Sequence, residues 1–220
     1  QGKMGGLQTG CYSYVIALLG IVFFAMMFVK QLWLGWLSVK SVRDCPEANI
    51  AGRKVRLLNT QALFAGQFGF FKPELVLSSG LLETLSSNHL EAVLAHEQGH
   101  YHYRDTFWFF WLGWMRECTS WLPNTEALWE ELLTLRELRA DAHAVLSVDP
   151  LLLAESLLMV VSSNPVSSEV LCAALGSPGA KRLEERVEAL LSPPQTTQKL
   201  EFTSLNWLVW TFVPLVSVVF

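Results

Sequence analysis

The residues best suited to chemistry lie at positions 90–105, in the stretch LEAVLAHEQGHYHYRD. This stretch places His96, Glu97 and His100 in the pattern HExxH. On a helix, histidines four residues apart project from one face, and their imidazoles can reach one metal ion at about 2.0–2.1 Å. Glu97, next to the first histidine, can take a proton from a water molecule that the metal activates. Because the pattern is short, the alternative is an amphipathic helix with two histidines on its polar face.

The motif needs a helix to hold it, and the surrounding residues predict one. Leu90, Val93 and Leu94 form an apolar face, and Ser87 or Asn88 can cap the start. The helix therefore buries one side while the motif faces a site. Further helices are expected at 81–85, 125–146, 150–161, 167–175 and 180–191.

Two short strands are predicted before this helix, at 54–58 and 74–77, because apolar residues alternate or run between turn signals there. Residues 45–52 and 61–72 are expected to be loops. An exposed edge strand next to a metal helix can pair with an extended substrate, and this is one of two equally supported expectations for 74–77. The alternative is a small structural hairpin. Gly99 leaves space on the helix flank, where substrate or another backbone could approach.

Two histidines leave a tetrahedral zinc site in need of one more protein ligand. We choose Glu137, because Asp141 follows it one turn later on the same helix face. One carboxylate can then bind the metal while the other accepts an N–H from a ligand histidine, and Arg136 or Arg139 can balance their charge. The alternative is a solvated ladder of charges. The other candidates for the third ligand are His102, Glu117, Glu130, Glu131, Asp141 and His143.

The composition favours a membrane protein. Hydrophobic residues make up 51% of the 220 and charged residues 16%, and the mean hydropathy is +0.32. Residues 12–29 form an uncharged apolar run about long enough to cross a bilayer, followed by Trp33 and Trp36 at the level of a headgroup belt. A signal peptide or a buried helix is the alternative. Residues 206–220 are expected to start a second span.

Residues 106–115, TFWFFWLGWM, are too few for a span and predict a helix that dips into the membrane or lies at its surface, with a buried core helix as the alternative. Lys30, Lys40 and Arg43 follow the first apolar run and favour a cytoplasmic location for the rest. The expected fold class is α+β and mainly helical: a zincin-type catalytic domain with a small β-hairpin or sheet, flanked by transmembrane helices. The expected parts are a loop at 1–11, a transmembrane helix and interfacial segment at 12–37, a metallopeptidase domain at 38–199 with its membrane-dipping helix at about 106–122, and the start of a second transmembrane helix at 200–220.

Other properties restrict the function. A net charge of −4 and a pI near 5.7 give no basic surface for nucleic acid. The four cysteines show no CxxC spacing, so neither a zinc knuckle nor a disulfide framework is expected, and a reducing compartment fits. Gln1 is not an initiator and Phe220 lies within an apolar run, so we expect a piece of a longer protein. The oligomeric state is not predicted.

Three separated motifs within 54–191 resemble the membrane zinc metallopeptidases of the HtpX type and their relatives in the BlaR/MecR antibiotic-sensor class. These are ELVLSSGLL leading to LEAVLAHEQGH, then RELRADAHAV, then RLEERVEALL. The resemblance implies an active site on the cytoplasmic side of the membrane. It also implies a set of roles: His96, His100 and Glu137 as zinc ligands, Glu97 as the catalytic base, and Asp141 as the support of a ligand.

The predicted function is a membrane-anchored zinc endopeptidase, whose partners are a protein or peptide substrate and the lipid bilayer. His143 stands where the HtpX type has a small residue, and we expect it to bind substrate, steady an oxyanion or cover the site. A signalling protease that cleaves one regulator is one alternative. A non-catalytic membrane scaffold with a metal site is another, although an intact Glu97 argues against it.

Overall fold

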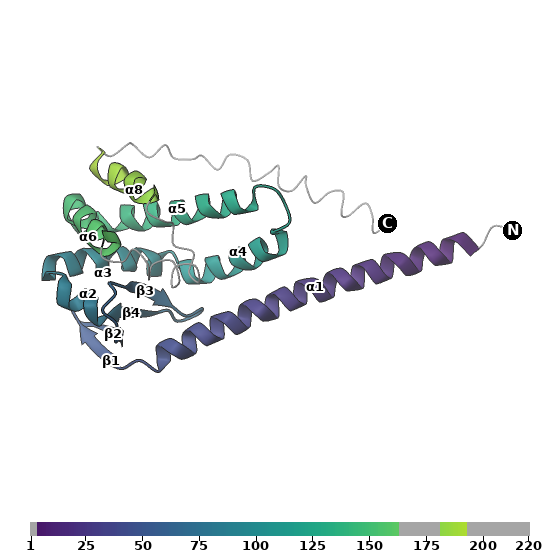
Figure 1. Cartoon of the computed structure of the whole chain (residues 1–220), viewed down its shortest axis with the longest axis horizontal. Coiled ribbons are helices and arrows are strands. Elements are labelled where there is room, and N and C mark those ends of the chain that lie inside the picture. The colour runs from purple at the N-terminus through teal and green to yellow at the C-terminus, as the bar shows by residue number, and fades with distance from the viewer. Residues whose placement is uncertain (1–3, 163–180, 193–220) are drawn as a thin grey trace.

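The computed structural model describes residues 4–162 and 181–192 (Figure 1). The described part is mainly helical with one small sheet, as expected for an α+β fold. The elements in chain order are α1 (Met4–Arg43), β1 (Glu47–Ile50), β2 (Arg53–Leu58), β3 (Ala65–Phe68), β4 (Glu74–Ser78), α2 (Ser79–Thr84), α3 (Ser87–His102), α4 (Asp105–Thr119), α5 (Thr125–Ala144), α6 (Pro150–Ser162) and α8 (Lys181–Leu191).

The sheet has the strand order β1-β2-β4-β3, with β2 and β4 parallel and the two outer pairs antiparallel. The two strands predicted from sequence form its centre as β2 and β4. β1 and β3 lie in segments that were expected to be loops. Their alanine, glycine and asparagine have little strand preference of their own, and pairing with a neighbouring strand overrides this weak preference.

The expectation that 74–77 forms an exposed edge is wrong. β4 lies between β2 and β3, with Leu75 paired to Val55 on one side and to Gln67 on the other. Its residues are accordingly almost all buried. The edge strand next to the motif helix is β3, which contacts α3.

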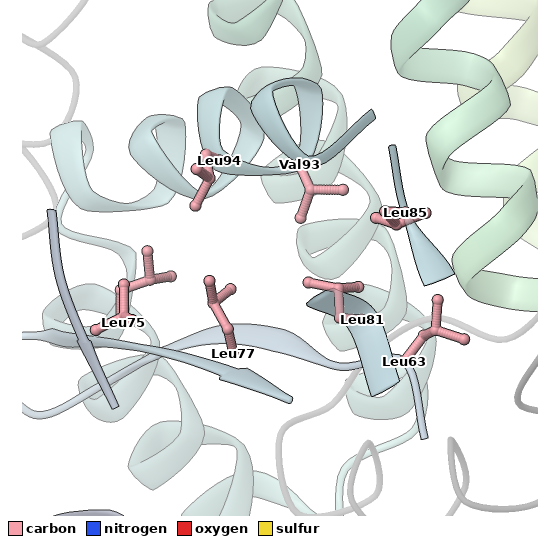
Figure 2. Close-up of a cluster of buried hydrophobic side chains, with 8 residues drawn as sticks. Leu63, Leu75, Leu77, Leu81, Leu85, Val93 and Leu94 are labelled. Atoms are coloured by element: carbon pink, nitrogen blue, oxygen red, sulfur yellow. The ribbon is translucent and has the colours of Figure 1, made fainter. Parts of the chain in front are cut away.

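The core between the sheet and α3 explains the orientation of the motif helix (Figure 2). Leu75 and Leu77 alternate onto one face of β4, and Val93 and Leu94 meet them from α3. Burying a leucine such as the fully enclosed Leu77 contributes on the order of 1.5–3 kcal/mol. The remaining buried members of this core are Val55, Leu63, Leu81 and Leu85.

The starts of α3 and α6 follow simple capping chemistry. Ser86 caps α3, one residue before the predicted candidates, and its hydroxyl accepts the His89 N–H at 3.4 Å. Asp149 precedes α6 and accepts the Leu151 N–H at 2.7 Å, with Pro150 as the first helical residue. The helices expected at 125–146, 150–161 and 180–191 are thus present as α5, α6 and α8.

α1 is long, apolar and exposed. Its segment Tyr12–Arg43 is long and apolar enough to cross a membrane. α4 forms where the short aromatic helix was predicted and packs on α1, with Phe28 stacked on Trp111 at 5.7 Å. The second span expected at 206–220 and the helix expected at 167–175 lie outside the described residues.

Candidate metal centre

The site begins with an unusually close approach of two helices. A Cβ atom at Gly99 of α3 would lie 2.9 Å from the Cα and 3.0 Å from the carbonyl oxygen of Ala140 on α5. Only glycine fits there without moving a backbone. Of the two approaches predicted for this glycine, another backbone is the one that the structure shows. The contact brings the acidic face of α5 against HExxH.

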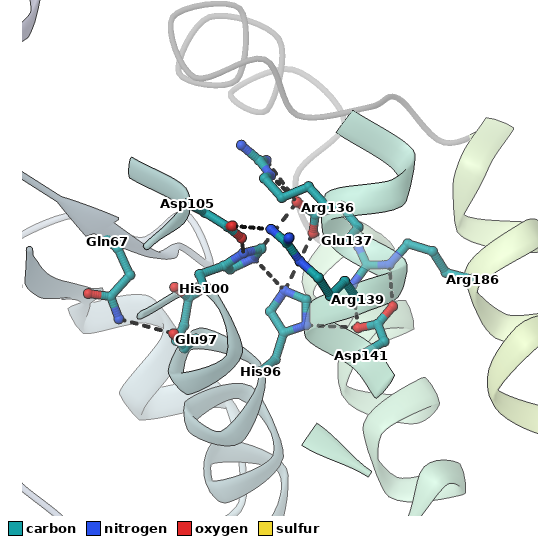
Figure 3. Close-up of polar contacts among 10 residues, drawn as sticks. All are labelled: Gln67, His96, Glu97, His100, Asp105, Arg136, Glu137, Arg139, Asp141 and Arg186. Carbon is teal, nitrogen blue, oxygen red and sulfur yellow. Dashed lines mark hydrogen bonds and ion pairs between the residues drawn. The ribbon is translucent and has the colours of Figure 1, made fainter. Parts of the chain in front are cut away.

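Three side chains converge across this contact (Figure 3). The Nε2 atoms of His96 and His100 lie 3.1 Å apart. Glu137 Oε2 lies 3.4 Å from His96 Nε2, and its Oε1 lies 3.8 Å from His100 Nε2. Two atoms each about 2.1 Å from a tetrahedral ion are roughly 3.4 Å apart. The spacing of these donors therefore fits one metal ion of the size and preference of zinc.

A carboxylate orients each histidine. Asp141 Oδ1 lies 2.8 Å from Nδ1 of His96, and Asp105 Oδ2 lies 2.7 Å from Nδ1 of His100. With its proton on Nδ1, each ring presents Nε2 as a lone-pair donor toward the site. A contact between Asp141 and a histidine of the motif was predicted from sequence. That of Asp105 was missed, although its position five residues after His100 could have suggested it.

Three arginines balance the carboxylates. Arg186 of α8 donates to both oxygens of Asp141, from Nε at 2.7 Å and from Nη2 at 2.8 Å, and its Nη1 lies 3.3 Å from Glu137 Oε2. Arg136 donates to Glu137 Oε1 from Nε at 2.9 Å and from Nη2 at 2.7 Å. Of the two predicted cations, Arg136 balances Glu137, whereas Arg139 of α5 pairs with Asp105 instead. Arg186 was missed, because it joins the cluster only through the packing of α8.

These contacts set the protonation states. Burial by itself would lower the pKa of His96, but hydrogen bonds to Asp141 and Glu137 outweigh it and raise this pKa to about 9. Burial opposes ionisation of Glu137, yet the charge of Arg136 and the contact with His96 hold its pKa well below the usual range. The pKa of Asp141 is lowered as well, chiefly by Arg186. Both carboxylates are therefore ionised at neutral pH, and a metal at His96 must displace a proton.

Glu97 differs from the other acids of the cluster. Its carboxylate is buried, and Oε2 has no hydrogen-bond partner among the described residues. Leaving such an acceptor unsatisfied costs about 1–3 kcal/mol or more. Its backbone oxygen accepts from Nε2 of Gln67 on β3 at 3.3 Å, which ties the edge strand to the motif. The free oxygen is available to a group from outside the chain, such as water.

The remaining predicted residues lie elsewhere. His143 stacks on His102 with ring centroids 4.9 Å apart, and its ring also meets the edge of Tyr103. This places His143 beside the C-terminal end of α3, and its catalytic role stays a prediction. Glu117 instead pairs with Lys30 at 2.6 Å. Two further candidates for the third ligand, Glu130 and Glu131, are exposed on α5.

Residues 35–122 match the model of peptidase family M48. The match includes the sheet and HExxH but ends before Glu137, and it covers less than half of the chain. It supports a metallopeptidase of this family, whose members typically bind zinc. A search of curated proteins found no match.

Proposed function

We propose that the chain is a membrane-anchored zinc endopeptidase of the HExxH class, related to the HtpX and BlaR/MecR types. One observation carries this proposal: two oriented imidazoles and a carboxylate converge at the motif that also holds Glu97, whose buried Oε2 has no hydrogen-bond partner among the described residues. A structural metal site needs the first three groups and has no use for the fourth. The match to peptidase family M48 supports a metallopeptidase in general.

The donor set fits zinc in chemistry as well as in spacing. Imidazole nitrogen and carboxylate oxygen are both zinc ligands, and two His with one Glu is a known catalytic set that leaves a position open. His96, His100 and Glu137 would hold the ion. When bound, zinc supplies Lewis-acid activation of a water molecule and of the scissile carbonyl.

Glu97 handles the proton. As water adds to the carbonyl carbon, the free carboxylate oxygen of Glu97 accepts a proton from that water. The peptide C–N bond then breaks, and Glu97 returns the proton to the leaving amine. The products are a carboxylic acid and an amine, and Glu97 ends ionised as it began. His143, which lies beside the C-terminal end of α3, remains a proposed contact for the substrate or the oxyanion.

β3 is the best-placed strand for an extended substrate. One of its sides pairs with β4, and within the described ranges 4–162 and 181–192 no strand pairs with the other. The Gln67 contact with Glu97 holds this edge beside the motif helix. A peptide that adds to β3 would present its backbone to the site through strand hydrogen bonds.

α1 supplies the membrane anchor. Its apolar part ends near Lys30, and Trp33, Trp36 and Lys40 follow at the level of the headgroups. Lys40 lies over the Trp36 ring at 5.2 Å, and Arg43 ends the helix. This bias of positive charge favours a catalytic domain on the cytoplasmic side.

The test is metal analysis combined with proteolysis, using the full chain purified in detergent without chelator. We expect about one zinc per chain and cleavage of unfolded casein that a chelator abolishes and added zinc restores. A chain that neither contains nor takes up zinc contradicts the proposal. Zinc uptake without cleavage of casein or of a panel of peptides supports the non-catalytic scaffold instead.

A further inference from the structure

α4 and α5 form an antiparallel hairpin that leaves large apolar side chains exposed. Phe109 packs on Trp129 at 5.6 Å. Arg136 lies over the Phe109 ring at 4.9 Å and Arg116 lies over the Trp129 ring at 5.2 Å, so the two helices run antiparallel. More than half of the surface is exposed for Trp108 and Met115 on α4, and for Leu128 and Leu135 on α5. The exposed apolar residues of this hairpin, which we call the hairpin face, are Trp108, Met115, Trp121, Leu122, Leu128, Leu132 and Leu135.

The two helices turn Trp108 and Leu128 to the same side. Trp108 precedes Phe109 and Leu128 precedes Trp129, so each lies about 100° from the helix–helix contact in the same rotational sense. In an antiparallel pair, equal rotations point to one side of the hairpin. Phe110 follows the contact residue Phe109 and is therefore turned in the opposite sense, which places it against α1.

The opposite side of the hairpin is already covered. α4 packs on α1, where the Phe28 ring meets Phe110, Trp111 and Trp114. α5 packs on α3 and directs Glu137 into the metal centre. The hairpin face therefore points away from α1 and α3, and it is the side on which a partner could lie.

The contacts with α1 set the level of the hairpin relative to a bilayer. Along α4, Phe110 lies 4.0 Å from the Cβ position of Gly35, while Trp114 meets Phe24. The C-terminal end of α4 thus points toward the apolar part of α1. Phe24 and Gly35 are about 16 Å apart along a helix and lie on either side of Lys30, where the apolar part ends.

We propose that the hairpin face rests in the headgroup–acyl boundary of the bilayer that α1 crosses. This rests on the proposed membrane anchoring and adds a second contact to it. Lipid fits better than a second copy because α4, which carries part of the face, packs along the apolar part of α1 through its other side. Two charged pairs lie near the face, Arg116 with Glu126 at 2.8 Å and Lys30 with Glu117.

The consequence concerns the substrate. Asp105 is the first residue of α4 and orients His100, so the metal centre is joined directly to the helix at the bilayer surface. The site would then reach chain segments that emerge from the membrane or lie along it. For the chain in a bilayer, segments held far from its surface would be poor substrates, whereas detergent removes this restriction.

The test places a fluorophore at Met115→Cys or Leu132→Cys in the full chain, in a background whose native cysteines are replaced and whose zinc content is unchanged. Glu83→Cys on α2 is the exposed control. In phosphatidylcholine vesicles with spin-labelled lipid, we expect strong quenching at 115 and 132 and little at 83.

Anchoring is measured on the same samples by carbonate extraction. If carbonate leaves the chain in the membrane but the labels at 115 and 132 are quenched no more than the label at 83, the hairpin proposal is overturned. The proposed membrane anchor is then still supported. Self-quenching at 132 with cross-linked dimers overturns it in favour of a second copy. Release of the chain by carbonate contradicts the anchor, and the hairpin proposal with it.

Discussion

Arg186 on α8 holds Asp141 on α5 with two hydrogen bonds, at 2.7 and 2.8 Å. Asp141 in turn lies 2.8 Å from Nδ1 of His96. Three helices are thereby linked in series, and the orientation of the first histidine depends on a residue 90 positions later in the chain. The planar guanidinium suits this role because its paired donors match the two carboxylate oxygens.

Arg186→Gln should weaken zinc binding about 10–100-fold, the usual effect of removing a group that orients a ligand. Arg186→Lys should recover only part of the loss, since an ammonium cannot hold both oxygens in one plane. Competition with a chromophoric chelator measures the affinity. Glu185→Gln, on the exposed side of the same helix, is the matched control and should bind as the native chain. Equal affinity in all four proteins would show that Arg186 has no positioning role.

Glu97→Gln should keep zinc and lose turnover. The amide is nearly the same size but cannot accept a proton, so cleavage should fall by about 10²–10⁴-fold. Zinc content and casein cleavage are measured on the same preparation. A variant that cleaves at the native rate would place the general base on another residue.

Glu137→Ala and Asp141→Ala should differ in severity. Glu137 offers a donor atom to the metal, so its loss should leave zinc absent or loosely held. Asp141 contacts only the far nitrogen of His96, so its loss should leave a measurable site about 10–100-fold weaker. Zinc retained by Glu137→Ala but lost from Asp141→Ala would reverse the two roles.

The metal-free protein should lose stability as the pH rises from about 6.5 to 9. The pKa of His96 in the folded chain is raised from 6.5 to about 9. Its protonated form therefore stabilises the fold fully below pH 6.5, and this contribution disappears as the ring deprotonates near pH 9. The raised pKa corresponds to at most about 3 kcal/mol.

Thermal unfolding in excess chelator measures this loss across pH 6–10. His96→Gln is the control and should show a flatter profile over that interval. A native chain whose melting temperature is constant from pH 6.5 to 9 would contradict the predicted coupling. Saturating zinc should also flatten the profile, because the bound ion takes the place of the proton.

The sequence predicts the parts of the fold and site that depend on local pattern. HExxH, the helix around it and the Glu137–Asp141 pair follow from spacing along single helices. β3 was missed because Ala65 and Gly66 have little strand preference of their own, and β4 supplies the pairing that holds them.

Two supports of the histidines were missed for a different reason. Asp105 contacts His100 because the chain turns sharply at Arg104, which has a positive φ of 54°. Arg186 reaches Asp141 because α8 packs against α5. Nearness to His100 in the sequence is the one signal for Asp105, while Arg186 has none, since its contact arises from the way two helices meet.

The contact between Gly99 and Ala140 changes what the motif itself means in this chain. HExxH leaves two positions unspecified, Gln98 and Gly99 in this chain, but the helix contact admits only glycine at the second. Any side chain at 99 would act as a wedge between α3 and α5 and move Glu137 away from the two histidines. A search for other proteins that build this centre on the same helix pair should therefore use the pattern HExGH, followed by a small residue three positions after the acidic ligand.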